Sequence, residues 1–286
     1  MQYKNCHLCP RECGIDRTAG ETGYCGCPDT ALVAKTMLHL WEEPALAGKG
    51  GSGAIFFGGC TLGCKYCQNR AISCKPAGKR MDAQQLRQEM ERLINQGAEN
   101  IDLVTPAHFL PTIRPALQPK LPVPVVYNCG GYEKVETLKK LEGLVDIYLP
   151  DLKYSDASLA AKLSGCADYF EVATRAIKEM ARQTGPAVYE GDRLQRGTVV
   201  RHLILPGCVE NSLRILDWLG ENFAPGEILV SLMRQYTPMG GLNAPFDRKV
   251  SQEEYDAVLS WMYLNDLHGF VQDEEAASKN YIPDFE

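Results

Sequence analysis

The chain has 286 residues, of which 45% are hydrophobic and 23% are charged, and its formal net charge is −6. This length supports one domain, or one domain with a small appendage, and the composition is that of an ordinary globular protein. Lysine and arginine are spread along the chain without a basic cluster, which argues against a nucleic-acid partner. No apolar run is long enough to cross a bilayer and residues 1–5 lack a hydrophobic signal core, so we expect no membrane partner and a cytoplasmic location.

The first 48 residues are rich in cysteine. Five of the chain's 12 cysteines lie there: Cys6, Cys9, Cys13, Cys25 and Cys27. In a reducing cytoplasm, clustered cysteines bind metal or carry redox chemistry more often than they form disulfides. A segment too short to bury a core needs an ordering force, and a metal held by four of these thiols can supply it. We therefore predict a cysteine-rich metal-binding module over residues 1–48, with free thiols or a redox pair at Cys6 and Cys9 as the alternatives.

From residue 53 onward, short apolar runs alternate with amphipathic stretches. The apolar runs show little polar alternation, as is typical of strands covered on both faces. The predicted strands are Ala54–Gly59, Asn100–Thr105, Val123–Cys129, Leu144–Pro150, Thr198–Leu205 and Glu227–Met233. Helices are predicted over 82–96, 133–142 and 167–183, each with an apolar face. Asn211 is a candidate N-cap for the next helix, and Ser251 with Glu254 forms a capping box for the last one.

Six strands separated by helices imply right-handed crossovers and a parallel sheet. Six units fall short of the eight that close a full barrel. We therefore predict an α/β fold, a partial (β/α)6 TIM-like barrel over residues 49–286, with a doubly wound open sheet as the alternative. Both architectures place the active site at the carboxyl ends of the strands. Residues 31–40 are expected to form a connecting strand and residues 48–53 a flexible link.

Three cysteines stand on the loop directly after the first predicted core strand. Cys60, Cys64 and Cys67 have the spacing C-x3-C-x2-C, and glycines at 58, 59 and 63 allow the backbone to approach a bound cluster. A [4Fe-4S] cube is normally held by four thiolates, one per iron, so three local cysteines leave one iron open to an exogenous ligand. The loop therefore predicts a [4Fe-4S] cluster with an open position, and a zinc-binding loop is the alternative.

This loop, at the end of the first strand of a partial barrel, resembles the signature of the radical S-adenosylmethionine (SAM) superfamily. The resemblance implies that the open iron chelates the amino and carboxylate groups of SAM. One electron passed to the sulfonium would then release a 5′-deoxyadenosyl radical. The resemblance also implies that Tyr66 packs near the adenine and that flavodoxin or ferredoxin is the electron donor.

Polar residues at the later strand ends resemble those of glycyl-radical-enzyme activases of the pyruvate formate-lyase activating enzyme type. The resemblance implies that Lys153 and Arg201 pair with the SAM carboxylate, and that Asp151 orients them or holds a small cation. An ordinary ion pair is the alternative. Asn128 lies near the position where activases carry an acid, and we include it among the cofactor-binding residues. The chain departs from the family at Val104-Thr105-Pro106, where the superfamily often has Gly-Gly-Glu, and it lacks the activase histidine after the sixth strand.

Along nearly its whole length the chain resembles the PflX-like group, which is related to pyruvate formate-lyase activating enzymes. The shared segments are Cys6-His7-Leu8-Cys9-Pro10-Arg11-Glu12-Cys13-Gly14, Gly23-Tyr24-Cys25-Gly26 and Cys67-Gln68-Asn69. On this pattern we assign Cys6, Cys9, Cys13 and Cys25 to a second metal, either zinc or an auxiliary iron–sulfur cluster. Cys27 could replace Cys25.

These observations together predict a radical SAM oxidoreductase that abstracts hydrogen from a substrate. The substrate is either a glycine of a partner glycyl-radical enzyme, or a small molecule or peptide. A non-enzymatic metal-binding protein is the alternative from another class. His108 and His202 are candidate acid–base groups, but an isolated histidine near a strand end is more often structural.

Overall fold

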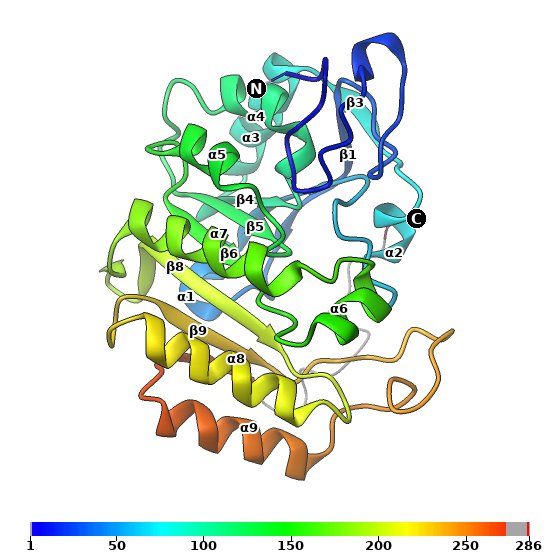
Figure 1. Ribbon diagram of the computed structural model, residues 1–286. Coiled ribbons are helices and arrows are strands. Elements are labelled where there is room, and N and C mark those ends of the chain that lie inside the picture. The colour runs from blue at the N-terminus through cyan, green and yellow to red at the C-terminus, as the bar shows by residue number, and fades with distance from the viewer. Residues whose placement is uncertain (1, 273–284, 286) are drawn as a thin grey trace.

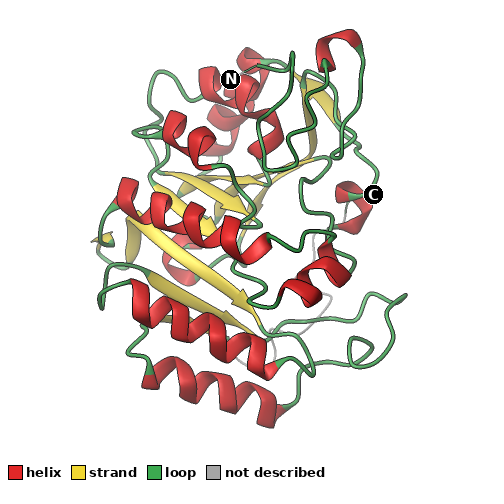
Figure 2. Cartoon of the chain, in the orientation of Figure 1, coloured by secondary structure: helices red, strands yellow, loops and turns green. Residues whose placement is uncertain are grey.

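The computed structural model describes residues 2–272 and residue 285. One curved sheet runs through the molecule, and the longer helices lie along its outer face (Figures 1 and 2). The strands are β1 Ala31–His39, β2 Ser52–Phe57, β3 Lys79–Met81, β4 Asn100–Val104, β5 Val125–Cys129, β6 Ile147–Pro150, β7 Val188–Glu190, β8 Arg193–Leu203, β9 Leu229–Met233 and β10 Gly269–Val271. The helices are α1 Pro44–Ala47, α2 Arg70–Ser73, α3 Ala83–Asn95, α4 Leu110–Ala116, α5 Val135–Leu138, α6 Ala157–Ser164, α7 Tyr169–Thr184, α8 Val209–Asn222 and α9 Gln252–Leu264. Within these described residues, no helix is both long and apolar enough to span a bilayer.

The strand order confirms the predicted partial barrel. It is β10-β9-β8-β6-β5-β4-β2-β1-β3, and the six predicted strands are parallel neighbours in this order. The order follows the sequence without a reversal, so the crossover helices all fall on one face and the sheet curves around the other. A doubly wound sheet would reverse its strand order and carry helices on both faces. β1 forms as expected and pairs antiparallel with β2.

The concave side of the sheet is filled by the segment between β1 and β2. In this segment Leu46 packs among the inward-facing residues Val126, Ile147, Leu149 and Val199. The side-chain amide of Asn100 donates a hydrogen bond to the Leu46 carbonyl oxygen at 2.8 Å. Residues preceding position 48 are thus part of the core, and the division of the chain at residue 48 stays a prediction.

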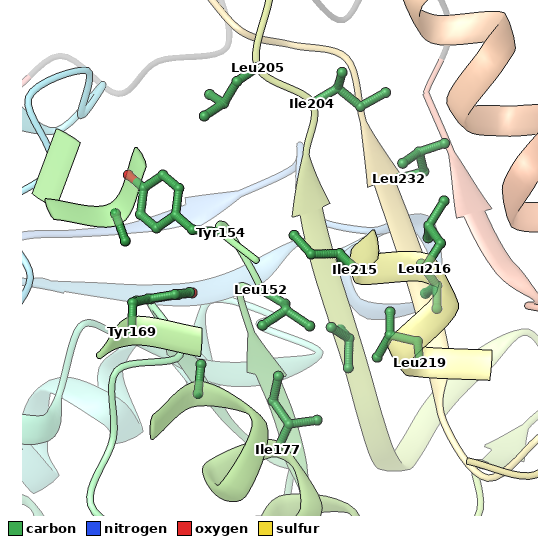
Figure 3. Close-up of a cluster of buried hydrophobic side chains, with 14 of the residues drawn as sticks. Leu152, Tyr154, Tyr169, Ile177, Ile204, Leu205, Ile215, Leu216, Leu219 and Leu232 are labelled. Carbon is green, nitrogen blue, oxygen red and sulfur yellow. The ribbon is translucent and has the colours of Figure 1, made fainter. Parts of the chain in front are cut away.

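The convex side of the sheet is covered by α7 and α8, which bury an aliphatic and aromatic cluster against β6, β8 and β9 (Figure 3). Fully buried members of this cluster include Leu152, Tyr169, Ile177, Ile215 and Leu219. Each such side chain contributes roughly 1.5–3 kcal/mol by its removal from water. This packing fixes the carboxyl ends of β6 and β8, where the predicted cofactor residues stand.

Two local predictions for the helices have different outcomes. The capping box of Ser251 and Glu254 is confirmed at the start of α9. The prediction that Asn211 is an N-cap is wrong, because Cys208 occupies that position and Asn211 lies inside α8. The side chain of Asn211 instead accepts a hydrogen bond from the Ser155 amide at 2.8 Å and donates one to the Lys153 carbonyl at 3.1 Å. These bonds stabilise the loop after β6.

Candidate active site

The cysteine loop spans residues 58–69 and connects β2 to α2. Two of its glycines adopt left-handed backbone conformations, Gly59 with φ 79° and Gly63 with φ 69°. A Cβ atom at Gly59 would lie 2.3 Å from the Cys27 sulfur and 2.8 Å from the Cys25 carbonyl oxygen. No larger residue fits there, because the N-terminal segment packs directly against the loop.

The three loop cysteines are free thiols, and each sulfur accepts a hydrogen bond. The donors are the Leu62 amide to Cys60 at 3.3 Å, the Ser164 hydroxyl to Cys64 at 3.1 Å and the Ser73 hydroxyl to Cys67 at 3.6 Å. Burial, together with the neighbouring sulfurs of Cys64 and Cys67, raises the pKa of Cys60 to about 12. A bound cation favours the thiolate form of a buried thiol such as Cys60, and hydrogen bonds to sulfur are what a thiolate-held cluster requires. The donor set therefore fits an iron–sulfur cluster.

Arg11 of the N-terminal segment clamps this loop to the end of α6. Its guanidinium donates to the carbonyl oxygens of Thr61 at 2.9 Å and Leu62 at 3.3 Å in the loop. It also donates to those of Ser164 at 3.1 Å and Gly165 at 2.8 Å at the carboxyl end of α6. The last carbonyls of a helix have no partners within the helix, so a cationic donor is favourable there. The Arg11 guanidinium also lies 3.8 Å from the centre of the Tyr24 ring.

A cavity opens beside the loop, at the carboxyl ends of the parallel strands. Cys64, Tyr66 and Cys67 line it from the loop. The four cofactor-binding residues predicted at strand ends also line it, namely Asn128, Asp151, Lys153 and Arg201. The structure thus brings the predicted site residues of the core together around one cavity, and Cys60 lies in the loop behind them. Their roles toward a cofactor stay predictions.

Asp151 is the centre of a buried ion-pair network in this cavity. Its carboxylate accepts a hydrogen bond from Arg201 Nε at 2.9 Å and pairs with Lys153 Nζ. Arg201 Nη2 donates a hydrogen bond to Asn128 Oδ1 at 2.6 Å, and Arg201 Nη1 lies 3.7 Å from Glu42 Oε2. Although burial acts in the opposite direction, the two neighbouring cations hold the pKa of Asp151 below its usual value. The network is therefore ionised and rigid, as a binding site for an anionic group requires.

The sequence analysis missed three acidic residues in this region. Glu42 and Glu43, which precede α1, line the cavity. Asp102 projects from the middle of β4 and lies behind the lining, beside Glu42. Asp102 Oδ2 accepts a hydrogen bond from the Asn128 amide at 3.2 Å. Two signals could have identified these residues. Asp102 is a charged residue inside an apolar strand, and consecutive glutamates directly precede a proline at residues 42–44.

Tyr66 lies deep beside the cavity rather than on an open wall. Its hydroxyl accepts a hydrogen bond from Tyr154 at 2.9 Å, and its ring lies 5.9 Å from that of Tyr236. This packing fixes an aromatic surface next to Cys67. The predicted contact between Tyr66 and an adenine ring stays a prediction.

The two candidate acid–base histidines are structural. His108 contacts the Gly58 carbonyl oxygen at 2.9 Å through Nε2 and supports the turn into the cysteine loop. His202 contacts the Leu152 carbonyl oxygen and the Ser212 hydroxyl, at 2.6 and 2.8 Å. Burial lowers the pKa of both imidazoles to about 4, so they are neutral near pH 7. Neither ring lines the cavity.

The five N-terminal cysteines are free thiols, and Cys25 and Cys27 lie against the cysteine loop at Gly59. Cys27 donates a hydrogen bond to the Gly58 carbonyl oxygen at 3.3 Å, and Cys13 accepts one from the Tyr24 amide at 3.4 Å. Across residues 2–272, no three His, Cys, Asp or Glu side chains are placed to hold a single metal ion. A cubane cluster spreads its thiolates over different irons and needs wider spacing. The second metal at Cys6, Cys9, Cys13 and Cys25 stays a prediction.

Comparison with known proteins agrees with this site. Residues 46–107 match a family model described as a 4Fe-4S single cluster domain. This match contains the whole cysteine loop and confirms the prediction of a [4Fe-4S] cluster in this part of the chain. An uncharacterized protein of Methanocaldococcus jannaschii is 29% identical over 261 residues, covering 82% of this chain and 67% of its own length.

Solved structures show the fold. Streptococcus suis SuiB bound to S-adenosylmethionine superposes with a TM-score of 0.54 at 12% identity, over 76% of this chain and 49% of SuiB. A radical SAM methyltransferase from Sphaerobacter thermophilus superposes with a TM-score of 0.52 at 13% identity, over 77% of this chain and 66% of the methyltransferase chain. The chain shares its fold with these two proteins. It spans about half the length of SuiB, which has also been solved with its precursor peptide SuiA and then gives a TM-score of 0.52.

Proposed function

We propose that the chain is a radical SAM enzyme whose cavity binds SAM between the cysteine loop and the network around Asp151. One observation carries this proposal. Two cluster cysteines, Cys64 and Cys67, line the same cavity as the cationic residues Lys153 and Arg201. A cofactor that touches an iron–sulfur cluster with a carboxylate at one end needs this arrangement of thiols and fixed cations.

When bound, SAM and a reduced [4Fe-4S] cluster supply a 5′-deoxyadenosyl radical that abstracts hydrogen from a substrate. Cys60, Cys64 and Cys67 hold the cluster in this proposal. The Ser73 and Ser164 hydroxyls donate to the sulfurs of Cys67 and Cys64, and so stabilise their thiolate character.

Lys153 and Arg201 have different tasks. All three Arg201 nitrogens are engaged, with Asp151, Asn128 and Glu42. The hydrogen bonds described for Lys153 Nζ go to Asp151 alone. Although burial acts in the opposite direction, Asp151 and the nearby Cys64 raise the pKa of Lys153. We therefore assign the direct contact with the SAM carboxylate to Lys153. Arg201 then positions Asp151 and adds positive charge to the same region.

The proposal includes two kinds of substrate. A glycine of a partner glycyl-radical enzyme is one, and the other is a small molecule or a peptide. The solved complex of SuiB with a precursor peptide gives the second kind a structural precedent in this fold. A glycyl electron paramagnetic resonance signal on a candidate partner protein, formed only with active enzyme, would assign the first kind.

The deciding experiment is SAM turnover by anaerobically reconstituted protein with dithionite as reductant. The proposal predicts 5′-deoxyadenosine at a rate that depends on both the cluster and the reductant. A reconstituted protein with an intact cluster spectrum and no 5′-deoxyadenosine would contradict it. A flavodoxin or ferredoxin, the expected physiological donor, should replace dithionite.

A further inference from the structure

The floor of the cavity is rich in carboxyl groups. Glu42 lies beside Asp102 and Arg201, and Glu43 lies beside Glu42 and Arg201. The Glu43 side chain makes no capping bond to α1. Within residues 2–272, Asp102 Oδ1 is buried without a hydrogen-bond partner. Burial of acceptors without donors is costly, so this floor is suited to a ligand that brings donors.

The charge of this region is also unbalanced. Four carboxyl groups, those of Glu42, Glu43, Asp102 and Asp151, surround the two cations Lys153 and Arg201. Burial is the largest cause that raises the pKa of Glu42, Glu43 and Asp102 above the usual value. The side chains of Glu42 and Asp102 also face each other. A positively charged group placed among these carboxyls would offset the cost of burying them together.

Two further polar side chains are buried beside this acidic cluster. His39 is 8% exposed and lines the cavity, and its Nε2 lies 3.9 Å from Glu42. His39 Nδ1 has no hydrogen-bond partner among the described residues. Ser231 is 0% exposed, and its hydroxyl faces the Glu43 carboxyl. Ser231 pairs in register with Arg201, so both side chains point to the same concave face.

We propose that this floor is the subsite for an organic cation with N–H donors, an alkylammonium or guanidinium group carried by the substrate. The inference rests on the proposed function, because it assigns the substrate class of that enzyme. A bare metal ion does not fit, since no three acidic, cysteine or histidine side chains in residues 2–272 are arranged to hold one. An N–H cation can donate hydrogen bonds to the Glu42 and Glu43 carboxyls, which line the cavity, and its charge offsets the excess of acidic groups there.

A chain of ion pairs connects this subsite to the cluster end of the cavity. Lys153 is the cation near Cys64, and Asp151 joins it to Arg201. Arg201 in turn faces Glu42 at 3.7 Å. A substrate anchored at the floor would therefore extend past the Asp151 network toward the cluster end, where the reacting hydrogen must lie.

The test is anaerobic calorimetry on the reconstituted holoenzyme with SAM present, using butylammonium and butylguanidinium as probes. n-Butanol is the neutral control, and tetramethylammonium is the control that has charge but no N–H donor. We expect the two N–H cations to bind and both controls to bind at least tenfold more weakly. Glu43→Gln should weaken butylammonium binding at least tenfold, the loss expected for one charge-assisted contact. Glu171→Gln, at a carboxyl that is 74% exposed, is the matched control and should bind like the wild type.

Ser231→Ala keeps the negative charge of the floor and gives a second variant if Glu43→Gln fails to fold. It should weaken butylammonium binding several-fold. Equal binding of tetramethylammonium and butylammonium, no binding of either N–H cation, or wild-type affinity in a folded variant would overturn the proposal. A tripeptide Ala-Lys-Ala that binds as tightly as butylammonium would assign the cation to a peptide side chain, and its failure to bind would assign a free amine. Binding is measured without turnover, so this result is independent of whether SAM is cleaved.

Discussion

Arg11 connects the N-terminal segment to the cysteine loop, and its replacement has a predictable cost. Arg11→Ala should lower the free energy of unfolding by about 3 kcal/mol. Its bonds to Thr61 at 2.9 Å and Ser164 at 3.1 Å are partly buried, and charge-assisted bonds of this kind contribute about 1.5–3 kcal/mol each before solvent screening. The bond to Gly165 is exposed, and Leu62 has a second donor in the Tyr24 hydroxyl. These two hydrogen bonds of Arg11 therefore add little to the free energy of unfolding.

The assay is urea denaturation of reconstituted wild type and variant, with the rate of iron loss to a chelator as a second readout. Because Arg11 holds the loop against α6, we expect the variant to unfold at lower urea and to lose iron faster. The Arg11→Lys variant should have intermediate stability and an intermediate rate of iron loss, because an ammonium group cannot reach all of the carbonyl oxygens that the guanidinium binds. Arg70→Ala is the matched control. Within residues 2–272, the Arg70 side chain donates its one hydrogen bond to the exposed Lys65 carbonyl at 3.4 Å. The loss of this side chain should cost less than about 0.5 kcal/mol.

The result that would refute this reasoning is an Arg11→Ala variant that matches Arg70→Ala in both unfolding free energy and iron retention. The N-terminal segment would then be a passive neighbour of the loop. A variant with normal global stability and faster iron loss would show that the clamp acts locally on the loop.

Three further predictions concern the cofactor, pH and the second metal. Lys153→Ala and Arg201→Ala should each weaken SAM binding by roughly ten- to hundredfold at unchanged iron content, and unchanged affinity in both would assign them to the fold or the substrate. Burial raises the pKa of Glu133 to about 8, so its ionisation destabilises the folded state increasingly as pH rises from about 4.5 toward 8. Glu133→Gln should therefore match the wild type near pH 4.5 and be roughly 3 kcal/mol more stable at pH 7, and equal urea midpoints at pH 7 would contradict this. Simultaneous replacement of Cys60, Cys64 and Cys67 with Ala should leave about one zinc or about four iron per chain at the N-terminal cysteines, whereas a folded protein with neither metal would exclude the second site.

Much of the core could be predicted because its signals are local. Continuous apolar runs predicted the six parallel strands, and C-x3-C-x2-C on the first strand end predicted the cluster loop. The residues Asp151, Lys153 and Arg201 follow or lie within strands whose ends must meet at one edge of the sheet. Their convergence on one cavity follows from the topology alone.

Other parts of the fold and of the site could not be predicted, because they depend on contacts between segments that are distant in the sequence. Glu42 and Glu43 precede a four-residue helix that fills the barrel interior, and no periodicity in the sequence indicates this placement. Arg11 stands 50 residues or more from the carbonyls it binds. Asn211 was wrongly predicted as a cap because its amide serves the β6 loop instead of its own helix.

The most direct measurement of the central claim is 5′-deoxyadenosine formation by the wild type and by Cys60→Ala, Cys64→Ala and Cys67→Ala, each reconstituted anaerobically and reduced with dithionite. Cys74→Ala is the control, since this cysteine is exposed and lies outside the loop. We predict turnover by the wild type and the control, and none by the three loop variants, because two thiolates cannot hold a cube with only one iron open. Normal 5′-deoxyadenosine formation by any loop variant, or none by the wild type with an intact cluster, would contradict the account.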